Sequence, residues 1–257
     1  MSKDQWLLRP NRSSPLNQDI KLLCFPYAGG SAATYLDWHN WLPQNVDLVA
    51  IQPPGRASRI FEPGYKNMHD LVDSLIEALY KELSSPYILF GHSLGSRIAF
   101  ELMNRCLAQN LPLPHRFIAS GSRGPHLSPR ITSIYRLPDA QFIEKLKSIN
   151  GTPKEILENS ELMELCLPML RSDFELADKY KYSGDCVFDC PVSIFGGKSD
   201  SEISVDELKT WQKFFSKDIT IELFAGDHFF IDSCKTSVIS KVNEIIKFEL
   251  TNLQVVS

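Results

Sequence analysis

The chain has 257 residues, 43% of them hydrophobic, and carries a formal net charge of −4. This length and apolar content suit one large α/β domain spanning residues 1–257. The acidic balance offers no basic surface for nucleic acid or an anionic membrane. Because the apolar run at 6–8 is too short for a signal peptide and no stretch reaches membrane-spanning length, we expect a cytoplasmic protein.

Short apolar runs alternate with longer helical patterns along the chain. Alternation of this kind predicts a mostly parallel sheet with helices on both faces. The longest helical patterns lie at 68–83, after residue 93 and at 238–250, and we expect a loose tail at 251–257. The predicted buried strands are the runs at 22–25, 48–51, 87–90, 117–119, 192–195 and 219–224.

The pentapeptide Gly-His-Ser-Leu-Gly at 91–95 stands between the third predicted strand and the helix that follows it. A serine on such a turn is the nucleophile-elbow pattern, in which glycines on both sides let strand and helix pass closely. The turn presents the Ser93 hydroxyl at the top of the sheet. The helix N-terminus offers the Leu94 amide to an oxyanion. A structural glycine turn is the alternative, but this context favours acyl transfer.

A serine nucleophile needs an imidazole base, and six histidines compete for that role. His228 follows the last predicted strand at its carboxyl end, where the active sites of α/β proteins form, and is the predicted base. His92 neighbours Ser93, but on an extended segment its side chain points the other way. We therefore expect His92 to pack or to form hydrogen bonds.

The histidine in turn needs a carboxylate, which in the α/β-hydrolase order lies between nucleophile and base. Asp200 follows the strand at 192–195 through a loop that begins with two glycines, and is the predicted acid. Asp206 and Asp227 are alternatives. Asp227 is disfavoured because an immediate neighbour rarely folds back onto its own imidazole.

The loop Phe-Pro-Tyr-Ala-Gly-Gly-Ser at 25–31 is expected to supply a second amide for an oxyanion. A plain tight turn or a phosphate cradle would also use two glycines. The Lys-Ser/Thr ending of a phosphate-binding loop is missing, so nucleotide binding is disfavoured. The six cysteines form no Cys-x-x-Cys pair, and we expect neither a disulfide framework nor a metal site.

The interval between the strands at 117–119 and 192–195 is longer than a crossover needs and predicts a helical insertion at about 125–188. The insertion carries two apolar helical stripes, which either pack on the sheet and each other or form a lid over Ser93. A lid of this kind would make an apolar trough for an acyl chain. The stripes comprise Phe142, Ile143, Leu146 and Ile149, and then Leu162, Leu165, Cys166, Met169 and Leu170.

Taken together, these motifs resemble those of the type II (editing) thioesterases that accompany modular nonribosomal peptide and polyketide synthases. That family is related to the medium-chain acyl-carrier thioesterase of animal fatty acid synthesis. The likeness runs from about residue 22 to about residue 231. It is carried by CFPYAGG at 24–30, QPPGR at 52–56, GHSLG at 91–95, SRGPH at 122–126, NGTP at 150–153, LPMLRSDF at 167–174 and GDHFF at 226–230.

The resemblance implies an α/β-hydrolase with a helical lid that hydrolyses acyl thioesters. Its substrates would be acyl groups on the phosphopantetheine arm of acyl or peptidyl carrier domains, so the enzyme itself would need no cofactor. A monomer is the default expectation. Carried over position by position, Ser93 is the nucleophile, Asp200 the acid and His228 the base. The amides of Ala28 and Leu94 form the oxyanion hole.

Two departures from the family pattern bear on substrate choice. Ser96 and Arg97 replace small and apolar residues after the elbow, and Ser172 stands where alanine is commoner. Three other functions stay open: release of medium-chain fatty acids, hydrolysis of oxygen esters, and binding of carrier domains without catalysis. Four arginines are expected to be solvated or to meet an acidic carrier domain at the pocket rim, namely Arg56, Arg59, Arg123 and Arg130.

Overall fold

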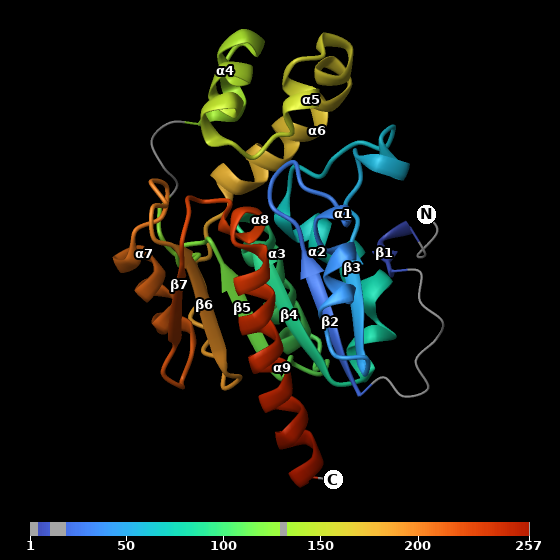
Figure 1. Ribbon diagram of the computed structural model, residues 1–257, viewed down its shortest axis with the longest axis vertical. Coiled ribbons are helices and arrows are strands. Elements are labelled where there is room, and N and C mark those ends of the chain that lie inside the picture. Colours follow the sequence, from blue (N-terminus) through green and yellow to red (C-terminus); the bar gives the residue numbers. More distant parts are fainter. Residues whose placement is uncertain (1–4, 11–18, 129–132, 257) are drawn as a thin grey trace.

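The computed structural model describes residues 5–10, 19–128 and 133–256, and its centre is a seven-stranded sheet in the order β1-β3-β2-β4-β5-β6-β7 (Figure 1). The edge strand β1 pairs antiparallel with β3, and the other neighbours pair in parallel. This mostly parallel sheet between helices is the predicted fold class. The strands are β1 (Leu7–Leu8), β2 (Ile20–Phe25), β3 (Val46–Ile51), β4 (Tyr87–His92), β5 (Arg116–Ser120), β6 (Val192–Gly197) and β7 (Thr220–Phe224).

Helices cover both faces of the sheet. The α-helices are α1 (Ala33–Leu36), α2 (Met68–Leu79), α3 (Leu94–Ala108), α4 (Asp139–Ile149), α5 (Lys154–Leu157), α6 (Ser160–Lys179), α7 (Val205–Lys209), α8 (Phe230–Ser233) and α9 (Lys235–Val256). Single 3₁₀ turns are η2 (Asp37–Asn40), η3 (Ala57–Arg59), η4 (Glu82–Ser84), η5 (Ile134–Arg136) and η6 (Thr210–Phe214). Within the described ranges, no helix is both long and apolar enough to cross a membrane.

Each face of the sheet has its own core, and strand β2 shows how the sequence builds both. Leu23 and Phe25 pack in the core under α2 and α3, whereas Leu22 and Cys24 pack in the core under α1 and α9. Successive side chains of a strand point to opposite faces. An unbroken apolar run therefore fits a strand that is buried on both sides.

The chain ends differ from the sequence expectation. The apolar run at 6–8 contributes the short edge strand β1, which was not predicted. Helix α9 continues to Val256, so the expected loose tail is wrong for residues 251–256, and Ser257 lies outside the described residues. The helix continues because Leu250 and Leu253 extend its apolar stripe and pack against the core under α9.

Helices α4, α5 and α6 stand above the carboxyl ends of the strands, on the connection between β5 and β6 (Figure 1). They share a small core of their own, separate from the two sheet cores. The expected stripe on α6 is partly wrong, because Leu162 and Leu165 are 41% and 44% exposed while Met163 is buried. The buried members of this core are Ile134, Phe142, Leu146, Met163, Met169 and Leu170.

Candidate active site

Ser93 stands on a strained turn between β4 and α3. Its backbone φ is +53° and ψ is −114°, a conformation that residues with a side chain seldom adopt. The flanking glycines make the turn possible. A β-carbon on Gly91 would lie 2.5 Å from the Ser96 nitrogen, and one on Gly95 would overlap the Phe25 carbonyl group at the end of β2. Strand β4, helix α3 and strand β2 thus approach one another too closely for any other residue type.

His228 and Asp200 form a buried pair at the same edge of the sheet. His228 Nδ1 donates to Asp200 Oδ2 at 2.8 Å, and the Asp200 side chain is only 1% exposed. The second carboxylate oxygen accepts the Glu202 and Ile203 amides at 2.7 and 3.0 Å. Burial raises the pKa of Asp200, but the hydrogen bond and charge of His228 and the two amides outweigh it, so this pKa lies below its ordinary value.

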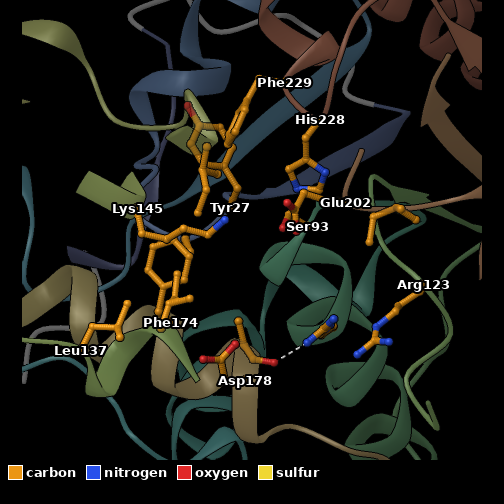
Figure 2. A pocket seen from close by; sticks show the side chains of 16 residues that line it. Tyr27, Ser93, Arg123, Leu137, Lys145, Phe174, Asp178, Glu202, His228 and Phe229 are labelled. Atoms are coloured by element: carbon orange, nitrogen blue, oxygen red, sulfur yellow. Dashed lines mark hydrogen bonds between the residues drawn. The ribbon is translucent and has the colours of Figure 1, made fainter. Parts of the chain in front are cut away.

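The His228 ring lies beside the Ser93 side chain in Figure 2, and both border one cavity. Because Nδ1 of His228 carries the proton shared with Asp200, the other ring nitrogen is the basic one. The structure therefore brings together Ser93, His228 and Asp200 as the sequence placed them. The two alternative acids have other partners: Asp227 accepts the Phe229 amide, and the exposed Asp206 pairs with Lys209.

His92 holds the backbone of His228 in place. Its Nε2 donates to the backbone carbonyl of His228 at 3.0 Å, so its Nδ1 must accept the Ser120 hydroxyl at 2.9 Å. Burial first, and then the charge of His228, lowers the pKa of His92 well below 6.5, which keeps the ring neutral. The sequence indicated hydrogen bonding by His92. Its contact with the His228 backbone, 136 residues away, had no sequence signal.

The loop after β2, residues 26–31, borders the same cavity and is called the oxyanion loop below. The Tyr27 carbonyl accepts the Gly30 amide at 2.9 Å. Since a trans peptide points its N–H opposite to its C=O, the Ala28 amide faces away from Gly30. Leu94 is the first residue of α3, and amides in the first turn of a helix lack an intrahelical partner. Ala28 lines the cavity, and Leu94 directly follows the cavity residue Ser93 in the chain.

The cavity has a volume of about 400 Å³. Its roof comes from η5, α4 and α6, which contribute apolar walls such as Ile134, Ile149 and Phe174. Charged side chains share the lining: Arg97, Arg123, Lys145, Asp178 and Glu202. Arg97 also donates a hydrogen bond to the Ala177 carbonyl, which connects α3 to α6 at the cavity edge. The space above Ser93 therefore combines apolar and polar surface.

Two of the four arginines expected at the surface are buried instead. Arg56 is 5% exposed and forms a two-pronged ion pair with Asp173, and Arg59 is 2% exposed beneath the Trp6 ring. Further hydrogen bonds compensate for the burial of the two guanidinium groups: Arg56 donates to the Gly30 carbonyl, and Arg59 donates to the Gln52 carbonyl and pairs with Glu62. Arg123 does border the cavity and pairs with Glu207. Arg130 lies outside the described residues.

Comparison with known proteins agrees with this geometry. Residues 20–246 match the thioesterase domain family. The chain belongs to the thioesterase family. This thioesterase is thus a hydrolase of thioesters, on an α/β-hydrolase fold.

Individual relatives match the thioesterase over nearly its full length. A Brevibacillus parabrevis protein named linear gramicidin dehydrogenase LgrE is 34% identical and covers 96% of this chain and 94% of its own. The structure of ClbQ from the colibactin NRPS/PKS pathway is 34% identical, with a TM-score of 0.85 over 93% of this chain and 100% of that one. The type II thioesterase BorB from the borrelidin biosynthetic cluster is 27% identical, with a TM-score of 0.85 over 97% and 99%. The resemblance to type II thioesterases is confirmed.

Proposed function

We propose that this thioesterase removes aberrant or stalled acyl groups from the phosphopantetheine thiol of carrier domains in nonribosomal peptide or polyketide biosynthesis. The observation that carries the proposal is the placement of Ser93 and His228 at one cavity, with Asp200 bonded to His228, in a chain similar to a type II thioesterase over nearly its full length. A cytoplasmic site of action is part of the same proposal, because the carrier domains are its substrate.

Acylation begins when Ser93 Oγ attacks the thioester carbonyl carbon while His228 takes the hydroxyl proton. Asp200 holds the imidazole in the required tautomer and stabilises the cation that forms. The oxyanion of the tetrahedral intermediate accepts hydrogen bonds from the Ala28 and Leu94 amides. The C–S bond then breaks and the acyl group stays on Ser93. The departing sulfur takes the proton from His228, or it leaves as a thiolate and His228 gives its proton to solvent, so that His228 is neutral before deacylation.

Deacylation reverses the roles. A water molecule gives a proton to His228 and attacks the acyl-serine, and the same two amides hold the second oxyanion. Ser93 leaves with the proton from His228, which restores the free enzyme and releases a carboxylic acid. Because a thiolate is a good leaving group, the rate depends on how well the oxyanion is held and on access of water.

The segment at about 125–188 acts as the lid in this proposal. Its side chains form the roof of the cavity, and Lys145 from α4 reaches in beside Phe174 from α6 (Figure 2). Mixed polar and apolar walls suit an editing enzyme, which must accept chemically different acyl groups rather than one alkyl chain. This lining supports broad acceptance over selection of medium-chain fatty acids.

The name of LgrE indicates a dehydrogenase, but the sequence of this chain disfavours that reaction. Binding of a dinucleotide by the usual βαβ motif needs the pattern Gly-x-Gly-x-x-Gly. None of the 13 glycines in the chain is followed by another glycine two positions later. The turn after β2 carries the adjacent pair Gly29 and Gly30 instead.

The test is acyl release from a phosphopantetheinylated carrier protein loaded separately with acetyl, butyryl or octanoyl groups. We expect the native protein to release all three, and Ser93→Ala to release none above background. The matched control is Ser84→Ala, an exposed serine on η4, which should behave as the native protein. A steep octanoyl optimum would favour fatty acid release, and carrier binding with no turnover would favour a non-catalytic binding module.

A further inference from the structure

Asp173, on the lid helix α6, reaches across to the oxyanion loop. Its Oδ2 accepts the Gly29 amide at 2.8 Å, and Gly29 lies so close to α6 that a β-carbon on it would be 2.8 Å from Leu170 Cδ2. The backbone φ of Gly29 is +82°, a region that glycine adopts without strain. One helical turn of α6, from Leu170 to Asp173, thus fits against a single glycine of the loop.

Arg56 completes the connection. Its two terminal nitrogens donate to the two Asp173 oxygens at 2.7 Å each, and Nη1 also donates to the Gly30 carbonyl at 2.8 Å. Arg56 and Asp173 are each only 5% exposed. The pair therefore holds the Gly29 amide and the Gly30 carbonyl, which lie on either side of the peptide bond between Gly29 and Gly30.

These bonds constrain the Ala28 amide, which the family resemblance implies as an oxyanion donor. Asp173 fixes the peptide between Ala28 and Gly29, and the Gly30 amide fixes the Tyr27 carbonyl of the preceding peptide. Only the two backbone torsions of Ala28 lie between these held groups, so the direction of its N–H follows from them. A buried ion pair is by itself weak evidence of a stabilising role. Here its hydrogen bonds end on the loop backbone at the reaction centre.

We propose that Asp173 is a positioning residue that, with Arg56, aims the Ala28 amide at the oxyanion and so makes the rate of acyl transfer depend on the lid helix. The inference rests on the proposed function. Asp173→Asn keeps the shape and one acceptor oxygen but places an amide group against the guanidinium of Arg56. The Gly29 to Gly30 backbone then loses its charged anchor.

The test compares native protein and Asp173→Asn with a butyryl thioester of N-acetylcysteamine and with n-butylboronic acid. The boronic acid forms a bond from boron to Ser93 Oγ while the serine proton passes to His228, and nothing leaves. The resulting anionic boronate mimics the tetrahedral intermediate. We expect Asp173→Asn to lower kcat and to weaken boronate inhibition by roughly tenfold or more, with KM within about threefold.

The matched control is Glu249→Gln. Glu249 on α9 forms a comparably buried ion pair with Arg116 on β5, which the substitution breaks. This variant should lower the Tm without changing kcat or boronate inhibition. If Asp173→Asn does not fold, Arg56→Lys tests the same link, because lysine cannot bind Asp173 and the Gly30 carbonyl in the same way. Native-like kcat and boronate inhibition in either folded variant would overturn the inference while leaving the function intact. A native protein with no turnover and no boronate binding would overturn both.

Discussion

A single methyl group at Gly95 should disable the active site while leaving the protein folded. In Gly95→Ala the new β-carbon would lie 2.7 Å from the Phe25 carbonyl carbon and 2.8 Å from the Pro26 oxygen, with the Phe25 oxygen nearer still. All of these are backbone atoms and cannot rotate away. Ordinary contact distances require α3 and the end of β2 to separate by roughly 1 Å.

That separation acts directly on the two proposed oxyanion donors, because the Leu94 amide begins α3 and the Ala28 amide follows β2. A displacement of this size at a reaction centre costs about 100-fold in rate, or about 2.7 kcal/mol of transition-state stabilisation. Overpacking should also lower the free energy of unfolding by about 1–3 kcal/mol.

The assay is single-turnover release of a butyryl group from a thioester, with urea unfolding measured in parallel. The control is Gly184→Ala, because the three atoms nearest to its new methyl group would all belong to the Tyr182 side chain, and Gly184 does not line the cavity. We expect the control to keep native kcat. If Gly95→Ala retained activity within threefold of the native protein, the close approach of α3 to β2 would not be what sets the oxyanion geometry, and the reasoning would be refuted.

Three further changes probe the base, its support and the lid. Asp200→Asn should lower kcat by roughly 10⁴-fold with KM little changed, measured by acyl release, because an amide cannot hold the required imidazole tautomer. His92 stays neutral in the folded protein, whereas in the unfolded chain it takes up a proton below about pH 6.5. Its contribution to the free energy of unfolding is therefore complete above pH 6.5 and falls by about 1.4 kcal/mol per pH unit below that value. Urea unfolding at pH 7.5 and 5.0 should show this loss in the native protein and a smaller loss in His92→Gln. Burial also lowers the pKa of His126, and the resulting loss of unfolding free energy at low pH is the same in both proteins. Phe142→Ala removes a fully buried ring whose centroid lies 5.7 Å from that of Phe174, a residue of the cavity wall. In a substrate titration this variant should raise KM more than it lowers kcat.

Most of the fold could be predicted because the sheet is buried on both faces. Each parallel strand contains a short run rich in apolar residues, and all six predicted strands are present with ends that differ by a few residues. Two of the features that were missed are weakly patterned. Strand β1 has two residues, too few for any periodicity. In the last turns of α9, Leu253 stands among polar residues, and its packing on the core is visible only in three dimensions.

The site divides in the same way. Ser93 could be placed from sequence because the glycines at 91 and 95 are required by local sterics, and His228 could be placed because it follows a strand end. The role of Arg56 could not be predicted, because its partner Asp173 lies 117 residues away and neither local sequence indicates the pairing. Long-range side-chain pairing is decided by tertiary packing rather than by local pattern.

One consequence follows from where Asp173 lies. The adjacent residue, Phe174, forms a wall of the acyl cavity, while Asp173 holds the oxyanion loop through Gly29 and Arg56. The same helix thus shapes the space for the acyl group and fixes a group proposed to stabilise the transition state. A substitution at Phe174 that tilts α6 to admit a larger acyl group would also move Asp173. Widening substrate acceptance through this wall should therefore lower kcat, whereas widening it through Ile149 on α4 should leave kcat nearly unchanged.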